Sequence, residues 1–144
     1  MSKTTNLALP GWLVAGVQLV NASAGSPEFA PTILCQLRMD AAPGDAPERV
    51  AKADLDKAVR PLPGAKVHSE APRRVGDVAV HEVDVELSAN DQRLRQLMWF
   101  FSAGGHVFTA IASCLPARYA ETRAELERGL TGVVALVCSS VPVQ

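Results

Sequence analysis

The clearest indication of the fold is the stretch from Arg93 to Cys114, RLRQLMWFFSAGGHVFTAIASC. It contains two largely apolar runs, and the pair Gly104-Gly105 separates them. Glycine adopts the positive φ angles that a tight turn between antiparallel strands needs. The stretch therefore predicts a β-hairpin with strands at 93–103 and 106–114.

Two further strand candidates lie near the amino terminus. Leu13–Val20 is a run of Val and Leu bounded by turn-forming residues. Thr32–Met39 has the alternating period of a strand. One side of that strand would carry Ile33, Cys35, Leu37 and Met39, and the other side Thr32, Leu34, Gln36 and Arg38.

The middle of the chain predicts a meander, in which a short strand at Ala65–Ser69 and a turn at Arg73–Asp77 precede a long strand at Val78–Leu87. The long strand has an inward apolar set, Val83, Val85 and Leu87, and an outward acidic set, Glu82, Asp84 and Glu86. We expect the acidic set to be a row solvated by water, because like charges on one face repel; a cation or basic-partner site is the alternative. Val78 and Val80 are out of phase with the inward set, which predicts a bulge or a change of partner strand near Val80-His81.

Two segments change to a helical period. In Pro47–Arg60 apolar residues recur at three- and four-residue spacing, and Pro61 ends the helix. A second helix is predicted from Pro116 to Leu130 or slightly beyond, with an apolar stripe that reaches Val133. Because strands and helices do not alternate regularly, the pattern predicts an α+β fold with an antiparallel sheet.

Length and charge limit the classes of function. A chain of 144 residues suits one domain over 1–144, with 1–6 and 139–144 flexible. Fourteen basic and fifteen acidic side chains leave a net charge of −1, which argues against a nucleic acid partner. No apolar stretch approaches the roughly 18 residues of a membrane-spanning helix, so we expect no membrane insertion. The start of the sequence lacks the features of an export signal, which predicts a cytoplasmic location.

No pattern in the sequence predicts a catalytic or metal centre. The residues with suitable chemistry are His68, His81, His106, Cys35, Cys114 and Cys138. The histidines lie in no metal-binding motif, and widely spaced cysteines in apolar runs indicate buried, reduced thiols. A nucleophile elbow is missing, and the glycine pair lacks the spacing of a phosphate-binding loop. We therefore expect no catalytic residue, no metal and no cofactor.

The run Leu97-Met98-Trp99-Phe100-Phe101 is apolar at every position. Both faces of such a strand carry large hydrophobic groups, so each face must be covered. Either the sheet is central with a helix on each face, or one face is a surface for an apolar partner or a second copy of the chain. In the second interpretation the partner-binding residues are Trp12, Leu97, Trp99 and Phe101.

Several short motifs support a family resemblance. They are Leu9-Pro10-Gly11-Trp12, the Phe29–Leu34 entry to a strand, Val75-Gly76 before a long strand, and the hairpin Gln96–Thr109 followed by a helix. In these features the sequence resembles the PsbP-like superfamily, and within it most nearly the LpqN/LpqT and DcrB-like bacterial group. The resemblance implies a three-layer α/β/α sandwich around a central antiparallel sheet, and a non-enzymatic role.

The roles of that superfamily guide the functional expectation. Its members serve as photosystem accessory subunits, as a regulator of a small GTPase, as mycobacterial lipoproteins, and as cytoplasmic chaperones that cradle apolar helices of type VI secretion effectors. This sequence lacks the lipidation cysteine of the lipoproteins near its start, so the resemblance favours the cytoplasmic branch.

We expect a homodimeric, non-enzymatic module that binds another protein or its apolar helix, as a secretion-associated adaptor or chaperone. Burial of apolar surface would supply the affinity. The alternative hypothesis is an enzyme or small-ligand binder with a pocket between helix and sheet, which would use some of His81, His106 and the nearby carboxylates.

Overall fold

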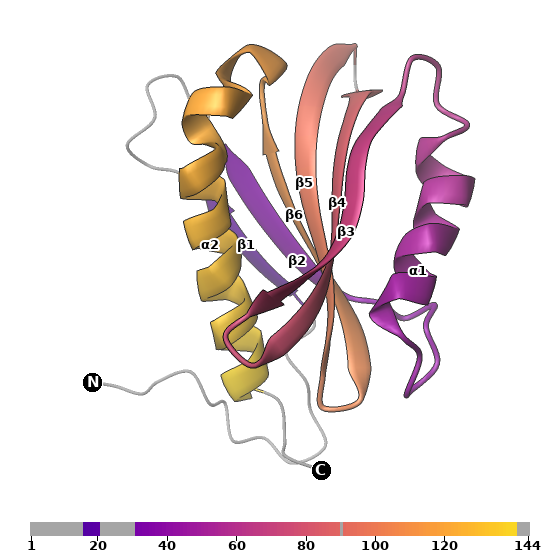
Figure 1. Cartoon of the computed structure of the whole chain (residues 1–144), viewed down its shortest axis with the longest axis vertical. Helices are drawn as coiled ribbons and strands as arrows, with labels where there is room; N and C mark the ends of the chain where they lie inside the picture. Colours follow the sequence, from indigo (N-terminus) through magenta and orange to yellow (C-terminus); the bar gives the residue numbers. More distant parts are fainter. Residues whose placement is uncertain (1–15, 21–30, 90, 141–144) are drawn as a thin grey trace.

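The protein folds as a six-stranded antiparallel sheet with a short helix on one face and a long helix on the other (Figure 1). The computed structural model describes residues 16–20, 31–89 and 91–140. The sheet order is β1-β2-β6-β5-β4-β3. The elements in chain order are β1 (Gly16–Val20), β2 (Thr32–Leu37), α1 (Pro47–Asp54), the π-helical turn η2 (Leu55–Val59), β3 (Lys66–Val75), β4 (Val78–Ala89), β5 (Gln92–Ala103), β6 (His106–Cys114), the 3-10 turn η3 (Pro116–Arg118) and α2 (Tyr119–Ser140).

The predicted central hairpin is confirmed as β5 and β6. Gly104 and Gly105 form its turn with φ angles of 59° and 82°. Strands β2 and β4 and helix α1 also lie where their periods predicted them. The fold class is α+β, and the helix on each side of the sheet gives the expected three layers, as Figure 1 shows.

The hairpin of β3 and β4 is longer and more regular than predicted. Its turn is confined to Gly76-Asp77, so Arg73 and Arg74 belong to β3. The prediction of a bulge or a change of partner near Val80-His81 is wrong, since β4 pairs with β3 and β5 on both sides of that point without a step and the register shifts between Val67 and Ser69 instead. A sheet with a helix on each face has two core faces, so apolar residues of both phases are accommodated in one straight strand.

Helix α2 continues past the predicted end at Leu130 to Ser140. Val133, Val134 and Val137 extend its buried stripe, so the helix still gains apolar burial beyond that point. Ser139 and Ser140, expected to be flexible, are its last residues. Residues 1–6 and 141–144 lie outside the described residues.

Each face of the sheet has its own hydrophobic core. The core under α2 contains Trp99, Phe101, Phe108, Leu126 and Leu130, among others. The core under α1 contains Val50, Leu55, Val83, Met98 and Phe100, among others. Adjacent residues of β5 thus enter different cores, as the alternation of a strand requires.

Small residues let α2 approach the sheet closely. Strand β6 presents Ala110 and Ala112 to the helix, and both are fully buried. On the helix side, a Cβ added at Gly129 would collide with the Ile33 side chain of β2. Any larger residue at this position would have to displace the end of the Ile33 side chain, so the close approach of helix and sheet favours glycine.

Candidate protein-binding surface

The residues predicted to bind a partner lie in the core under α2. Leu97, Trp99 and Phe101 are each 0% exposed in the single chain. The prediction that they form an exposed adhesive surface is therefore wrong. The other interpretation holds, because α2 covers one face of β5 and α1 covers the other. Trp12 lies outside the described residues.

The acidic row of β4 is also placed differently from the prediction. Asp84 is 3% exposed and lies under the start of α2. Arg95 binds both of its carboxylate oxygens, with Nε 2.7 Å from Oδ1 and Nη2 3.1 Å from Oδ2. The Tyr119 hydroxyl donates a third hydrogen bond, at 2.9 Å. Burial, followed by this bond to Asp84, raises the pKa of the tyrosine.

Glu82 lies two residues before Asp84 on β4, so its side chain is on the same face of the sheet. Its carboxylate accepts hydrogen bonds from Trp99 Nε1 at 2.8 Å, Arg73 Nη1 at 2.9 Å and Arg123 Nη2 at 3.2 Å. Arg73 and Arg123 also bind Glu127 of α2, at 3.0 and 2.7 Å. Among the described residues no buried side-chain nitrogen or oxygen lacks a hydrogen-bond partner. The network therefore anchors α2 to β3, β4 and β5.

Glu86, the third acidic residue of the row, makes contacts near the far end of β4. Its carboxylate accepts a hydrogen bond from Arg93 Nε at 2.9 Å and lies 3.3 Å from His68 Nε2. The hydrogen bond from Arg93 is the main reason that the pKa of Glu86 is lowered. The row is thus paired with arginines along its length, so the prediction of a freely solvated row is wrong.

The histidines do not converge. His81 is buried on the α1 side of the sheet, where its Nε2 lies 2.7 Å from Glu70 Oε2. His106 follows the β5–β6 turn and precedes Val107, which belongs to the α1-side core; His106 therefore faces the opposite side. His68 pairs with Glu86 instead. Among the described residues no group of three potential ligands could hold a metal ion.

The three cysteines are free, as expected. Cys35 and Cys114 are buried, and burial raises the pKa of their thiols to about 12 and about 11. Cys138 is half-buried near the end of α2, where burial also raises its thiol pKa. Since the thiolate is the reactive form, these positions disfavour a nucleophilic cysteine.

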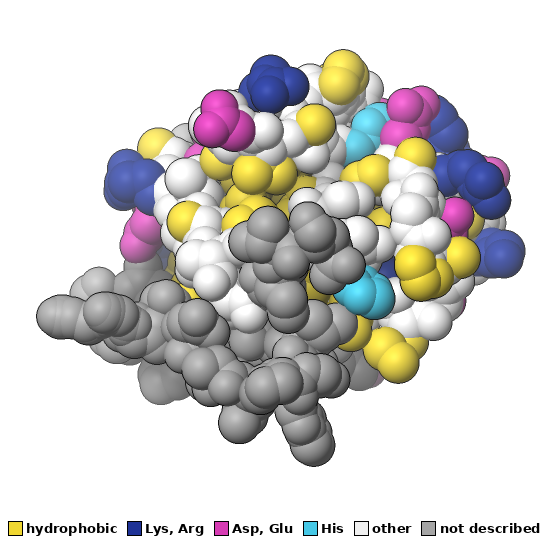
Figure 2. All heavy atoms as spheres, turned by 90° about the horizontal axis from the view of Figure 1, so that it is seen from below, with side chains coloured by type: hydrophobic (Ala, Val, Ile, Leu, Met, Phe, Trp, Pro, Cys, Tyr) yellow, Lys and Arg dark blue, Asp and Glu magenta, His cyan; other side chains and the backbone are white. Residues whose placement is uncertain are grey.

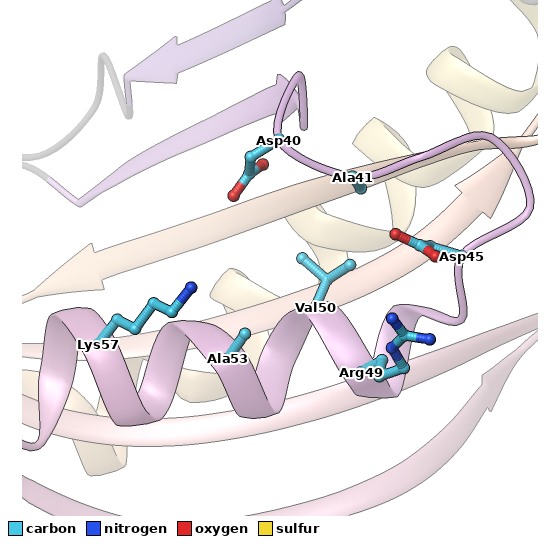
Figure 3. Close-up of a pocket in the computed structure, with 7 residues that line it drawn as sticks. All are labelled: Asp40, Ala41, Asp45, Arg49, Val50, Ala53 and Lys57. Carbon is cyan, nitrogen blue, oxygen red and sulfur yellow. The ribbon is translucent and has the colours of Figure 1, made fainter.

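A polar groove of about 220 Å³ lies between α1 and the loop that precedes it (Figure 3). Asp40 and Asp45 of the loop face Lys57 and Arg49 on the helix side, and Val50 lies between them. Opposite charges thus line opposite walls. No histidine lines this groove, so it is not the helix–sheet pocket with converging imidazoles that the enzyme hypothesis requires.

One part of the sheet is left uncovered by α1. The register places Val83, Met98, Ile111, Leu34 and Gln18 in one row across β4, β5, β6, β2 and β1. Burial decreases along this row: Val83 and Met98 are buried, Ile111 is half-buried, Leu34 is 36% exposed and Gln18 is exposed. The cover provided by α1 therefore ends at β6.

The uncovered area, called the open strip below, consists of Gln18, Thr32, Leu34, Gln36, Ile111 and Ser113. None of these side chains is charged. Leu34 and Ile111 are direct cross-strand neighbours and form an apolar centre, with amide and hydroxyl groups around it. This arrangement of an apolar centre and a polar, uncharged rim is suited to binding another chain.

Sequence reasoning missed the open strip, although one signal was present. Leu34 is the apolar residue on the otherwise polar side of the β2 pattern. In a strand whose other side is buried, an apolar residue of that phase faces either a second core or a binding surface. The pattern alone does not separate these two outcomes, because they depend on where α1 lies.

No protein-family model matches this sequence, and neither does any curated protein. Solved structures are similar. PA94 of Pseudomonas aeruginosa, a protein of unknown function described as a putative regulator, is 17% identical, with a TM-score of 0.64 over 94% of this chain and 88% of its own. LpqN, involved in cell envelope biogenesis of Mycobacterium tuberculosis, is 18% identical, with a TM-score of 0.53 over 77% of this chain and 65% of its own. CyanoP, the PsbP of Synechocystis sp. PCC 6803, is 12% identical, with a TM-score of 0.46 over 90% of this chain and 82% of its own.

The similarities to PA94 and LpqN show a shared fold. The predicted resemblance to LpqN is thus confirmed for the architecture, whereas membership of its family stays a prediction. In the described part of the chain, no helix is long and apolar enough to cross a membrane.

Proposed function

We propose that this protein is a non-enzymatic binding module that holds an apolar helix of another protein on the open strip. The observation that supports this function most directly is the pair of exposed Leu34 and half-buried Ile111 within an uncharged surface. An apolar side chain that leaves water at such a surface contributes to binding, whereas a charged ligand would find no counter-ion there. A chaperone or adaptor that shields such a helix is the form of this function that the family resemblance implies.

The dimensions of the strip favour a helix as the ligand. Strands in a sheet lie about 4.8 Å apart, so β1, β2 and β6 together span about 10 Å. An α-helix with its side chains is also about 10 Å wide. Helix α1 already packs on the same face through Val50 and Leu55. A partner helix would lie beside α1 and complete the outer layer.

The test uses a synthetic Leu/Ala-rich helical peptide of about 20 residues, the length of a typical apolar helix. Titration of the isotope-labelled full-length protein should shift the NMR signals of Leu34 and Ile111 first. The variant Leu34→Glu places a charge at the centre of the strip and should weaken binding about tenfold or more. A matched control is Leu62→Glu, because Leu62 is 37% exposed but lies after α1, outside the strip.

Equal affinity of the two variants, or shifts confined to another surface, would contradict the proposal, and so would failure of the peptide to bind. Sedimentation velocity of each variant adds a second criterion. A dimer that Leu34→Glu dissociates and Leu62→Glu does not would mean that a second copy occupies the strip. A dimer that withstands both changes agrees with a strip that is free for a partner.

A further inference from the structure

Two pairs of opposite charges line the groove between α1 and the loop before it. At one end Asp45 faces Arg49, and at the other end Asp40 faces Lys57 (Figure 3). Val50 lies between the two pairs. In Figure 2, which views the molecule from the end at which α1 begins, acidic and basic side chains lie next to one another on the α1 side of the surface. The lining side chains therefore sum to no net charge, although both signs are concentrated there.

Hydrogen bonds hold the two carboxylates of the loop in place. Arg38 binds both oxygens of Asp40, with Nε 3.0 Å from Oδ1 and Nη2 2.7 Å from Oδ2. Asp45 accepts a hydrogen bond on Oδ2 from the backbone N–H of Ala42, at 2.9 Å. A backbone hydrogen bond of 3.0 Å from Gly44 ties the loop to the β5–β6 turn. The acidic wall is thus formed before any ligand binds, which lowers the entropy cost of binding.

The basic side chains on the helix are not engaged in the same way. Arg49 makes no hydrogen bond or ion pair within the described part of the chain, although Asp45 lies only four residues before it. Lys57 acts on Asp40 only through its charge, which adds to the lowering of the carboxyl pKa that Arg38 mainly causes. A guanidinium has five N–H donors and can bind a carboxylate through two of them. Arg49 thus offers a carboxylate site next to a fixed acidic group.

A change of helix type helps to align the basic wall. Helix α1 passes at Leu55 into the π-helical turn η2, in which the Arg60 N–H donates to the Leu55 carbonyl at 2.8 Å. A π turn contains more residues than an α turn, so Lys57 lies nearer to the line through Arg49 and Ala53 than it would in a continuous α-helix. Such π turns are frequent at functional sites.

The charge pattern and the size of the groove select the class of ligand. A simple anion would be attracted by Arg49 but repelled by Asp45, and a metal cation would meet the reverse. A molecule with both a carboxylate and an ammonium group matches both charges. The volume of about 220 Å³ is below that of pockets for drug-sized ligands, roughly 300–1,000 Å³. The remaining lining residues, Ala41, Val50 and Ala53, are apolar.

We propose that this groove binds a free α-amino acid with an aliphatic side chain. Arg49 binds the carboxylate, Asp45 accepts hydrogen bonds from the ammonium group, and the aliphatic side chain covers Val50 and Ala53. Lys57 and Asp40 border the far end of the site. The proposal does not depend on the proposed function, because no residue of the open strip lines the groove.

Titration of the isotope-labelled full-length protein with leucine tests the site. Leucine should shift the amide signals of Ala41, Val50 and Ala53 saturably, with a dissociation constant of about 1 mM for so open a groove. Two analogues isolate its charges: 3-methylbutylamine lacks the carboxylate, and 4-methylpentanoate lacks the ammonium group. Each should bind about tenfold more weakly or less. The absence of saturable shifts with leucine would overturn the proposal, and so would equal affinity for leucine and either analogue.

Two charge substitutions test the assigned roles. Arg49→Gln should weaken leucine binding about fivefold or more, whereas Arg60→Gln, at an exposed arginine outside the groove, should not change it. Asp45→Asn should also weaken binding, while its side-chain oxygen can still accept the hydrogen bond from Ala42 and keep the loop in place. Equal affinities of the Arg49→Gln and Arg60→Gln variants would overturn the assignment of the carboxylate site.

A steric substitution tests the location without changing a charge. Ala53→Leu fills the space between the two charge pairs and should abolish leucine binding, whereas Ala58→Leu, at an exposed alanine of η2 outside the groove, should leave it intact. Circular dichroism confirms that both variants fold. Leucine binding that survives Ala53→Leu would overturn the proposal. Leu34→Glu should leave leucine binding unchanged, so this site and the open strip can fail or succeed separately.

Discussion

The two faces of the sheet are covered in different ways. Six strands about 4.8 Å apart make a sheet about 24 Å wide, and one helix covers only about 10 Å of it. On one face, α2 contacts β2, β6 and β5, and the arginine–carboxylate network covers the side toward β3 and β4. On the other face, α1 contacts β4, β5 and β6, and the open strip remains.

The α2 face is held by buried ion pairs, whereas part of the α1 face is left uncovered. Lifting α2 from the sheet would leave the buried charges of the network unpaired. The open strip contains no charged group, so covering it would leave no buried charge unpaired, although its amide and hydroxyl groups would need hydrogen-bond partners. The predictions below test the contrast between the faces, beginning with the largest expected effect.

The sharpest comparison uses one residue type on both faces. Leu97→Ala, on the α2 side, should reduce the free energy of unfolding by about 4 kcal/mol, since a fully buried leucine leaves a cavity. Leu34→Ala, in the open strip, should cost only about 1 kcal/mol because Leu34 is 36% exposed and its truncation leaves no closed cavity. Urea denaturation of both variants measures the difference. Similar losses would show that the strip is covered in the free protein.

The ion-pair network should contribute almost as much as the apolar core beside it. Asp84→Asn keeps the size of the side chain but leaves Arg95 without a carboxylate and removes one of the three carboxylates that bind Arg123, which should cost about 3 kcal/mol. Asp56→Asn removes an exposed partner of Arg60 on η2 and should change stability little. Thermal unfolding of the two variants compares them. A small effect of Asp84→Asn would mean that α2 is held by its apolar stripe alone.

Substitution of two glycines of α2 by alanine distinguishes the effect of helix propensity on stability from the effect of close packing against the sheet. Gly132→Ala should stabilise the protein by about 0.8 kcal/mol, because nothing lies within 4 Å of the added Cβ and alanine favours the helix. Gly129→Ala should destabilise it by about 1 kcal/mol, because the new methyl group displaces buried Ile33. Chemical denaturation at one pH gives both values. Stabilisation by both changes would indicate that α2 can move away from the sheet.

Acid should weaken the anchoring of α2. The pKa of Glu127 is lowered, first by the hydrogen bond from Arg73 and then by that from Arg123. A carboxyl whose folded pKa lies below its unfolded value stabilises the fold above that unfolded value, near 4.5, and loses the contribution as the pH falls through the folded pKa. The melting temperature should therefore fall less steeply below about pH 5 in Glu127→Gln. Parallel pH profiles for the two proteins would exclude this contribution.

Local patterns predicted much of the secondary structure. The glycine pair located the β5–β6 turn, and the change from a period of two to one of three or four residues located α1. The predicted end of α2 was too early because its stripe continues through Val137, with no proline within the helix to stop it. These features depend on neighbouring residues, which is why the sequence reveals them.

Burial and pairing depend instead on residues far apart in the chain. The run around Trp99 predicted two apolar faces, yet only the positions of α1 and α2 show that both faces are closed there and that the surface at Leu34 is open. Asp84 has the pattern of a solvated residue, but Tyr119 and Arg123, more than 30 positions away, remove it from water. The sequence determined which side chains share a face of a strand, because the alternation of side chains is local. The tertiary structure decided which of those faces are exposed to water, because this depends on how many strands a helix covers, and no local pattern records that number.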